Sequence, residues 1–450
     1  MNGKLKKSYF SDTKSGFNKS RALLLKGGWV IDIAKKEQTK LDLIIKNGKI
    51  RELGKNLSGS FEGNVIDIED KVIVPGFLDM HVHFREPGRE DEETLMTGAA
   101  SAMAGGFTGV CTMPNTDPVT DNREIVEFIK DKFEDHLVDA YPIAAITLEQ
   151  KGEKLVEIAD LVDAGAVAFS DDGKSVMNSQ VMRRALEYAK MFDVPIIEHC
   201  EDAALAKGGV MNEGFMSSRL GLPGIPVISE QIVVARNVKL VDYTEGKMHL
   251  AHISTAGSVE IIRRAKEQGI KVTCEATPHH FTLTDKAVEF YDTNTKMNPP
   301  LCTQKDIDAI VAGLKDGSID AIATDHAPHS VEEKELEYID APFGIIGLET
   351  AIGLMITELI EKHNFSVYEV LEKVAVNPYK ILGLEVPHIA ENRLANLTII
   401  DLNEPWSVDK NKFKSRSRNT PFDGFQLTGK SYGVMNNSYF MLNSESEKNA

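Results

Sequence analysis

The sequence predicts an α/β fold: a (β/α)8 TIM barrel joined to a small β-sandwich-like domain that both chain ends form. A length of 450 residues suits a large barrel with an appended module. The middle of the chain alternates strand-like and helix-like segments eight times, and similar β-type segments occur near both ends. An open doubly wound sheet is the structural alternative, but no GxGxxG follows the first barrel strand and no P-loop is present.

The β-type segments near the two ends predict the small domain. Segments rich in Val, Ile and Leu occupy residues 22–31, 41–46, 49–53 and 65–68, and again 397–402, 432–435 and 439–442. Asn47-Gly48 between two of the first set is a strong hairpin signal. We therefore expect residues 21–75 and 385–443 to form this domain, with tails at residues 1–20 and 444–450.

The middle segments predict the barrel over residues 76–384. Strand-like runs begin near residues 76, 109, 138, 166, 195, 248, 271 and 319, and amphipathic helical stretches cover residues 125–133, 154–162, 181–190, 259–268 and 307–314. The longest uncharged run, residues 95–116, is broken by Gly105-Gly106 and a Met-Pro-Asn turn. It reads as a buried helix, turn and strand rather than a membrane span.

Composition argues against several classes of function. The 51 basic and 68 acidic side chains give a formal charge of −17, which disfavours a nucleic-acid or anionic-membrane surface. The four cysteines are scattered without a CxxC pair, and the first twenty residues lack the apolar segment of a secretory signal. We therefore expect a cytoplasmic protein without a disulfide framework.

Candidate metal ligands follow several of the expected barrel strands. His81 and His83 are two residues apart on one strand, so their imidazoles point to the same side. Later strands end in SDDG at 170–173, EHC at 198–200, AHIS at 251–254 and TDHAPH at 324–329. In a barrel these ends share one face, so the sequence predicts a site with enough ligands for two metal ions, as in a hydrolase.

Several neighbouring residues have two readings on spacing alone. Asp171 and Asp172 are each either turn residues or ligands, because Asp-Asp-Gly is also an ordinary turn sequence. Arg85 either holds a substrate carboxylate or pairs with Glu86 or Glu90. Asn115 either adds a neutral donor or only forms a turn after Pro114.

Three further histidines are expected to lie outside the ligand set. His279 and His280 follow the seventh strand, and we expect them to be structural or to support the ligands rather than to bind a metal. His326 directly follows Asp325, so its side chain should leave the opposite side of the strand.

These motifs resemble those of the dihydroorotases of the amidohydrolase superfamily, of the bacterial class I type, and the resemblance covers residues 22–430. The segments that carry it are DMHVHFREPG (79–88), TMPNTDP (112–118), AFSDDG (168–173), IEHCED (197–202), GLPGIPVISE (221–230), LAHIST (250–255), KMNPPL (296–301), ATDHAPH (323–329) and PFGIIGLE (342–349). One departure is Cys302, where the family commonly has arginine. The resemblance implies a TIM barrel with a small β domain.

The resemblance also implies roles for individual residues. The metal ligands it implies are His81, His83, Asp172, His199, His252 and Asp325. The substrate contacts it implies are His83, Arg85, Asn115, Asn298, His329 and the backbone of Phe343 and Gly344. The cofactor it implies is zinc, one or two ions per chain, with two expected.

The implied reaction is the reversible cyclisation of N-carbamoyl-L-aspartate to L-dihydroorotate by a metal-activated hydroxide, with Asp325 as the catalytic acid and base. Expected partners are this small anionic substrate, a second copy of the chain and aspartate transcarbamoylase. Dihydropyrimidinase, hydantoinase or allantoinase activity is the alternative, although those relatives bridge their metals with a carboxylated lysine and residues 166–173 contain none. A non-catalytic scaffold is a further alternative, which the complete ligand set disfavours.

Overall fold

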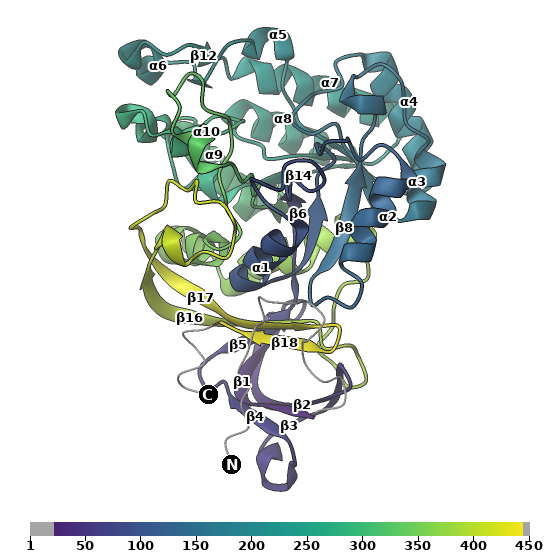
Figure 1. Cartoon of the computed structure of the whole chain (residues 1–450), viewed down its shortest axis with the longest axis vertical. Coiled ribbons are helices and arrows are strands. Elements are labelled where there is room, and N and C mark those ends of the chain that lie inside the picture. The colour runs from purple at the N-terminus through teal and green to yellow at the C-terminus, as the bar shows by residue number, and fades with distance from the viewer. Residues whose placement is uncertain (1–21, 444–450) are drawn as a thin grey trace.

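The computed structural model describes residues 22–443, in which two large sheets organise the chain (Figure 1). One sheet is parallel, is surrounded by helices and occupies the upper part of the molecule in this view. The other combines strands from the two ends of the chain, purple and yellow in the figure, beneath the first. The predicted α/β class, with a barrel and a β module from both termini, is confirmed.

Eight parallel strands form the barrel in sequence order. They are β6 (Phe77–Val82), β7 (Phe107–Thr112), β8 (Asp139–Ala144), β9 (Ala168–Phe169), β10 (Ile196–Glu198), β13 (Met248–Leu250), β14 (Val272–Ala276) and β15 (Ala321–Ile322). A parallel bridge between Val82 and His326 joins the end of the first strand to the segment after the last. The carboxyl ends of all eight strands therefore face one end of the barrel.

Helices follow the strands and cover the outside of the barrel. They are α1 (Leu95–Gly105), α2 (Arg123–Lys132), α3 (Ile158–Ala164), α4 (Ser179–Lys190), α7 (Ile228–Thr244), α8 (Ala256–Glu267), α9 (Gln304–Asp316), α11 (Ala351–Leu354) with a π-helical continuation (Met355–Lys362), and α12 (Val367–Ala375). Shorter elements are α5 (Ala203–Ala206), β11 (Met211–Asn212), α6 (Phe215–Leu220), β12 (Gly224–Ile225), α10 (Val331–Lys334) and α13 (Asn377–Ile381).

One predicted helix begins later than its sequence pattern indicates. Residues 154–157 were expected to be helical, but α3 starts at Ile158. The backbone N–H of Val156 donates to Ile146, and that of Leu148 donates to Lys154, so this segment pairs with the loop after β8. A tertiary backbone pairing outweighs the local helical periodicity here.

The second sheet is a single mixed sheet built from both chain ends. Its strands are β1 (Leu23–Asp32), β2 (Glu37–Lys46), β3 (Lys49–Gly54), β4 (Asn64–Asp67), β5 (Val72–Pro75), β16 (Leu397–Ser407), β17 (Gln426–Asn436) and β18 (Tyr439–Leu442). Its order is β18-β17-β16-β5-β1-β2-β3, with β4 beside β1. Asn47 and Gly48 have φ values of 53° and 69°, the conformation that a tight hairpin turn requires.

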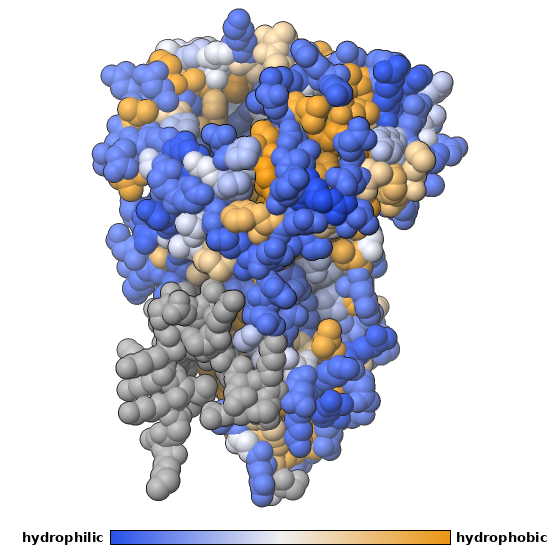
Figure 2. Space-filling view, turned by 45° about the vertical axis from the view of Figure 1, so that its right-hand side comes forward, coloured by the Kyte–Doolittle hydropathy of each residue, from blue (hydrophilic) through white to orange (hydrophobic). Residues whose placement is uncertain are grey.

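Apolar side chains fill the barrel wall and the inner face of the second sheet. Val110, Ile196 and Leu250 of the barrel strands, and Leu43 and Ile73 of the second sheet, are almost completely buried. Figure 2 shows one face of the molecule as mostly hydrophilic, with apolar side chains gathered mainly in the barrel half. Burial of the apolar strand faces therefore holds the strand ends, and any site on them, in fixed positions.

Among residues 22–443, no helix is long and apolar enough to cross a membrane. The predicted tails at residues 1–20 and 444–450 lie outside the described residues.

Candidate metal centre and active site

The six predicted metal ligands meet at the carboxyl end of the barrel. His81 lies in β6 and His83 directly after it, and Asp172, His199, His252 and Asp325 follow β9, β10, β13 and β15. All six side chains are buried. Five strands far apart in sequence therefore deliver imidazoles and carboxylates to one place, as the strand-end motifs predicted.

Short distances connect these side chains through the two aspartates. Nε2 of His81 is 3.3 Å from Asp172 Oδ1, and Nε2 of His83 is 3.1 Å from Asp325 Oδ1. Nε2 of His252 is 3.6 Å from the same Asp172 oxygen. His81, His83 and Asp325 form one group with the spacing of a metal site, and His81, Asp172 and His252 form another.

His199 joins the cluster through a neighbouring imidazole. Its Nδ1 is 3.1 Å from His252 Nε2, and its Nε2 is 3.5 Å from the Nδ2 group of Asn298. Burial, with the neighbouring His252, lowers the pKa of His199 to about 4. The imidazole is therefore neutral near pH 7, which is the form that binds a metal ion.

Several atoms of the cluster have no hydrogen-bond partner in the described part of the chain. They are His81 Nε2, Asp172 Oδ1 and His252 Nδ1, and close by His279 Nε2 and Asn298 Oδ1. A buried polar atom without a partner costs about 1–3 kcal/mol, so a concentration of them in one place calls for a ligand. Imidazole nitrogens and carboxylate oxygens are donors that divalent transition metals prefer, so the residues fit a metal centre.

The two aspartates after β9 have different surroundings. Asp171 accepts hydrogen bonds from the backbone N–H groups of Ile146 (2.8 Å) and Thr147 (3.0 Å) and from the Thr147 hydroxyl, so it holds the loop after β8. Asp172 faces the imidazoles instead. Burial alone would raise the pKa of Asp172, but the surrounding histidines hold it well below its usual value. Asp172 is therefore the ionised carboxylate of the cluster.

Asp325 has a similar electrostatic environment, because it shares His81 and His83 with Asp172. Burial would raise its pKa, whereas His81 and His83 lower it below the ordinary value of 3.8. Its backbone φ is 49°, in the left-handed region, and this conformation directs its carboxylate toward His83. An ionised carboxylate in this position can bind a cation and accept a proton.

Glu275 of β14 supports the cluster from below, and sequence reasoning missed it. Its Oε1 is 3.1 Å from His81 Nδ1 and its Oε2 is 3.1 Å from His249 Nε2. These two histidines outweigh burial and lower the pKa of Glu275 to about 2. A carboxylate on Nδ1 directs the His81 Nε2 lone pair into the site. The available signal was a single acid within the apolar strand VTCEA.

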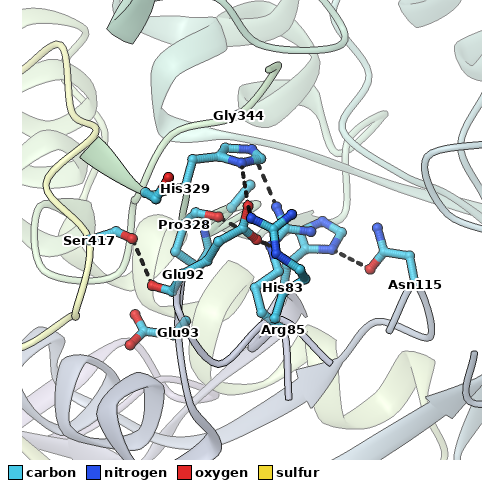
Figure 3. Close-up of polar contacts among 12 residues, drawn as sticks. His83, Arg85, Glu92, Glu93, Asn115, Pro328, His329, Gly344 and Ser417 are labelled. Carbon is cyan, nitrogen blue, oxygen red and sulfur yellow. Dashed lines mark hydrogen bonds and ion pairs between the residues drawn. The ribbon is translucent and has the colours of Figure 1, made fainter. Parts of the chain in front are cut away.

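Arg85 and Asn115 lie beside the cluster, as predicted (Figure 3). Asn115 Oδ1 is 2.8 Å from Nδ1 of His83, so its amide fixes the direction of that imidazole. Arg85 pairs with neither acid considered from the sequence. Its Nε is 3.1 Å from Glu92 Oε2 and donates to the carbonyl of Pro328 at 3.2 Å.

His329 completes this side of the site. Its Nδ1 is 3.0 Å from Glu92 Oε1, and its Nε2 is 2.7 Å from the carbonyl oxygen of Phe343 and 3.4 Å from Arg85 Nη2. Burial lowers the pKa of His329, and the hydrogen bond to Glu92 opposes that shift. We call Arg85, Glu92 and His329 the carboxylate wall.

The backbone of Phe343 and Gly344 lies next to His329 but already has partners. The Phe343 carbonyl accepts from His329, and the Gly344 N–H donates to the carbonyl of Lys296 at 2.9 Å. Gly344 has φ 129°, and a Cβ there would lie 2.7 Å from the side chain of Ala327. These backbone groups therefore shape the wall in this structure.

The neighbouring histidines have the supporting positions that the sequence predicted. His326 points away from the cluster: its Nδ1 accepts from the Gly347 N–H at 3.2 Å and its Nε2 is 3.4 Å from Glu93. His280 is held by the Thr277 hydroxyl and the Pro299 carbonyl at 2.8 and 2.9 Å.

Known proteins resemble the chain over nearly its whole length. Residues 70–258 match the family described as dihydro-orotase-like. The chain is 50% identical over 416 residues to a dihydroorotase of Acetivibrio thermocellus, covering 92% of this chain and 97% of that protein. It is 50% identical over 409 residues to a dihydroorotase of Pelotomaculum thermopropionicum, covering 90% and 95%.

Among solved structures, the fold resembles those of cyclic-amide hydrolases. An L-hydantoinase (dihydropyrimidinase) from Arthrobacter aurescens superposes with a TM-score of 0.83 at 24% identity, over 94% of this chain and 96% of that one. A dihydropyrimidinase from Brevibacillus agri gives 0.79 at 19% identity, over 94% and 95%. At these identities the likeness concerns the fold alone.

Proposed function

The chain belongs to the dihydroorotase family, and from this premise we propose that it catalyses the reversible cyclisation of N-carbamoyl-L-aspartate to L-dihydroorotate. One observation carries the proposal: a buried cluster of imidazoles and carboxylates lies directly beside the partly buried Arg85. The cluster suits hydrolysis of a cyclic amide, and the arginine suits a substrate that carries a carboxylate next to the ring.

We assign two zinc ions to the cluster as part of the same proposal. His81, His83, Asp172, His199, His252 and Asp325 are the residues that would hold them. When bound, the ions would polarise the ring carbonyl and lower the pKa of a water molecule. The mixture of imidazoles and two carboxylates supports this assignment, because two close cations need anionic ligands.

Asp325 is the residue proposed to move the proton. In ring opening its carboxylate accepts a proton from the attacking water and then delivers it to the ring nitrogen that leaves the carbonyl carbon. In ring closure the same two steps run in reverse. The low pKa of Asp325 keeps the carboxylate ionised at neutral pH, ready to accept that proton.

Arg85, His329 and two amides are proposed to bind and orient the substrate. Arg85 and His329 face the substrate carboxylate, and the Nδ2 group of Asn115 adds a donor because its Oδ1 is engaged by His83. Asn298, beside His199, contacts the rest of the ring. Holding a group remote from the reacting bond orients the ring without adding to the chemistry.

Substrate choice tests the proposal. Purified metal-loaded protein should open dihydroorotate with a kcat/KM at least about a hundredfold higher than for dihydrouracil, which lacks the carboxylate and so forgoes the charge-assisted contacts to the Nη groups of Arg85. Hydantoin and allantoin in parallel cover the related reactions. Comparable kcat/KM values for dihydroorotate and dihydrouracil would contradict dihydroorotase activity. A homodimer, an aspartate transcarbamoylase partner and a cytoplasmic location stay predictions.

A further inference from the structure

Glu92 is a buried carboxylate that the proposed mechanism does not use. It connects the other two residues of the carboxylate wall, Arg85 and His329 (Figure 3). Its Oε2 is 3.1 Å from Nε of Arg85, and its Oε1 is 3.0 Å from Nδ1 of His329. One carboxylate therefore joins residues 85 and 329, which follow the first and the last strands of the barrel.

These contacts determine which way the two partner groups point. Glu92 and the Pro328 carbonyl hold Arg85 at Nε. Because a guanidinium is planar, this fixes the direction of the Nη groups, and Nη2 lies 3.4 Å from His329 Nε2. The contact with Glu92 holds the His329 ring with Nδ1 toward the carboxylate, so Nε2 lies 3.4 Å from Arg85 Nη2 and 2.7 Å from the Phe343 carbonyl oxygen.

Glu92 is itself held by a segment of the small domain. Residues 408–425 connect β16 to β17, and within them the Ser417 hydroxyl donates to the Glu92 carbonyl oxygen at 2.8 Å. Arg89 Nη2 is a further 3.2 Å from Glu92 Oε1. Glu92 is only 3% exposed, so water competes little for these contacts.

We propose that Glu92 is a positioning residue for substrate carboxylate recognition: it holds Arg85 and His329 in the directions in which they bind that group. Ser417, in the small domain, stabilises this arrangement through its hydrogen bond to the Glu92 backbone carbonyl. The inference rests on the proposed function, because it assigns the specificity of that same site. Among the described residues, the Glu92 carboxylate contacts Arg85, Arg89 and His329 and none of the six candidate ligands, so its effect on the substrate passes through Arg85 and His329.

Charge and orientation lead to opposite expectations for removing the carboxylate. Loss of a negative charge beside Arg85 would by itself strengthen the binding of an anion. Loss of orientation would weaken it, because a glutamine at position 92 can accept a hydrogen bond from only one of its two partners. The sign of the change in KM therefore separates the two effects.

Glu93 provides a matched control in the adjacent position. It is also buried, but its carboxylate points away from the wall and binds the Ser415 hydroxyl and, at 3.0 Å, the Arg416 N–H (Figure 3). Glu93→Gln therefore perturbs the same loop and the same connecting segment while leaving Arg85 and His329 paired with Glu92.

The test compares wild type with Glu92→Gln, Glu93→Gln and Ser417→Ala, each metal-loaded and checked by thermal denaturation. For Glu92→Gln, the KM for dihydroorotate should rise about tenfold to a hundredfold while kcat falls less than about threefold. Turnover of dihydrouracil should change by less than about twofold. Ser417→Ala, which keeps the carboxylate, should raise KM about two- to fivefold, and Glu93→Gln should leave KM within about twofold.

The possible results separate the inference from the proposed function. An unchanged or lower KM in Glu92→Gln would overturn the positioning role, as would an equal rise in KM in Glu93→Gln. If Glu92→Gln does not fold, an unchanged KM in Ser417→Ala would overturn it. Failure of wild type to open dihydroorotate would overturn the proposed function. Calorimetry then measures the Kd for N-carbamoyl-L-aspartate, which reports binding of the substrate carboxylate independently of turnover. Equal Kd values in wild type and Glu92→Gln would overturn the inference.

Discussion

The metal-ligand cluster and the carboxylate wall lie side by side at the same end of the barrel, but they are completed in different ways. In the cluster, His81 Nε2, Asp172 Oδ1 and His252 Nδ1 have no hydrogen-bond partner within residues 22–443. In the wall, Glu92 joins Arg85 to His329. The protein alone thus pre-forms the wall, whereas the unsatisfied atoms of the cluster suit bound cations.

The largest effect is expected within the cluster, at Asp325. Asp325→Asn should lower kcat about 10²- to 10⁴-fold, because an amide cannot accept and return a proton, while much of the metal stays bound. Activity and metal content of the purified variant measure this. His326→Asn is the matched control, since His326 faces Glu93 and Gly347. Similar losses in the two variants would show that the carboxylate has no special role.

The next effect tests whether Asp172 supplies the anionic ligand without a carboxylated lysine. Apoprotein reconstituted with zinc in CO2-depleted buffer should recover full activity, since Asp172 needs no added carbon dioxide. Asp172→Ala should lower metal affinity about a hundredfold or more. Asp171→Asn, which alters only the loop after β8, serves as the control. Recovery that depends on bicarbonate would instead indicate a bridging lysine.

A smaller effect, on metal affinity, is expected from Glu275, which lies beneath the cluster. Glu275→Gln should weaken metal binding about 10- to 100-fold, because an amide orients His81 less strongly than a carboxylate. Competition with a chromogenic chelator measures the affinity. Thr273→Val removes only the outer hydrogen bond of His249 and should change the affinity less. Unchanged affinity in Glu275→Gln would mean that the cations alone orient the histidine.

The smallest effect concerns the segment that supports the wall. Burial raises the pKa of Glu349 from 4.5 to about 7, although its carboxylate accepts from the Lys414 and Ser415 N–H groups. The folded state therefore binds more protons than the unfolded state between these pH values, and stability falls as pH rises from about 4.5 to about 7.

Glu349→Gln should remove this dependence. Relative to wild type, the variant should gain on the order of 1 kcal/mol of unfolding free energy between pH 5 and pH 8. Denaturant unfolding at both pH values measures it. The same change in unfolding free energy with pH in both proteins would contradict the raised pKa of Glu349. Metal affinity should not change, because Glu349 contacts none of the six ligands.

The two halves of the site also differ in how far the sequence predicted them. The cluster was predictable in part, because His81 and His83 show a two-residue strand period and His199, His252 and Asp325 come soon after a strand ends. The choice of Asp172 over Asp171 came only from the family resemblance. Once a barrel is inferred, its topology brings all strand ends to one face. Arg85 and His329 were predictable only as members of a family motif, and their shared partner Glu92 was not identified.

The sequence by itself determined the barrel, the hairpin at Asn47-Gly48 and the shared direction of His81 and His83, because periodicity and turn chemistry act over a few residues. Only the tertiary structure decided that Glu92 joins Arg85 to His329 and that Ser417, between β16 and β17, supports it. Such contacts join residues 237 and 325 positions apart. They depend on how the buried backbone is packed, and no local pattern encodes which carboxylate a distant donor will meet.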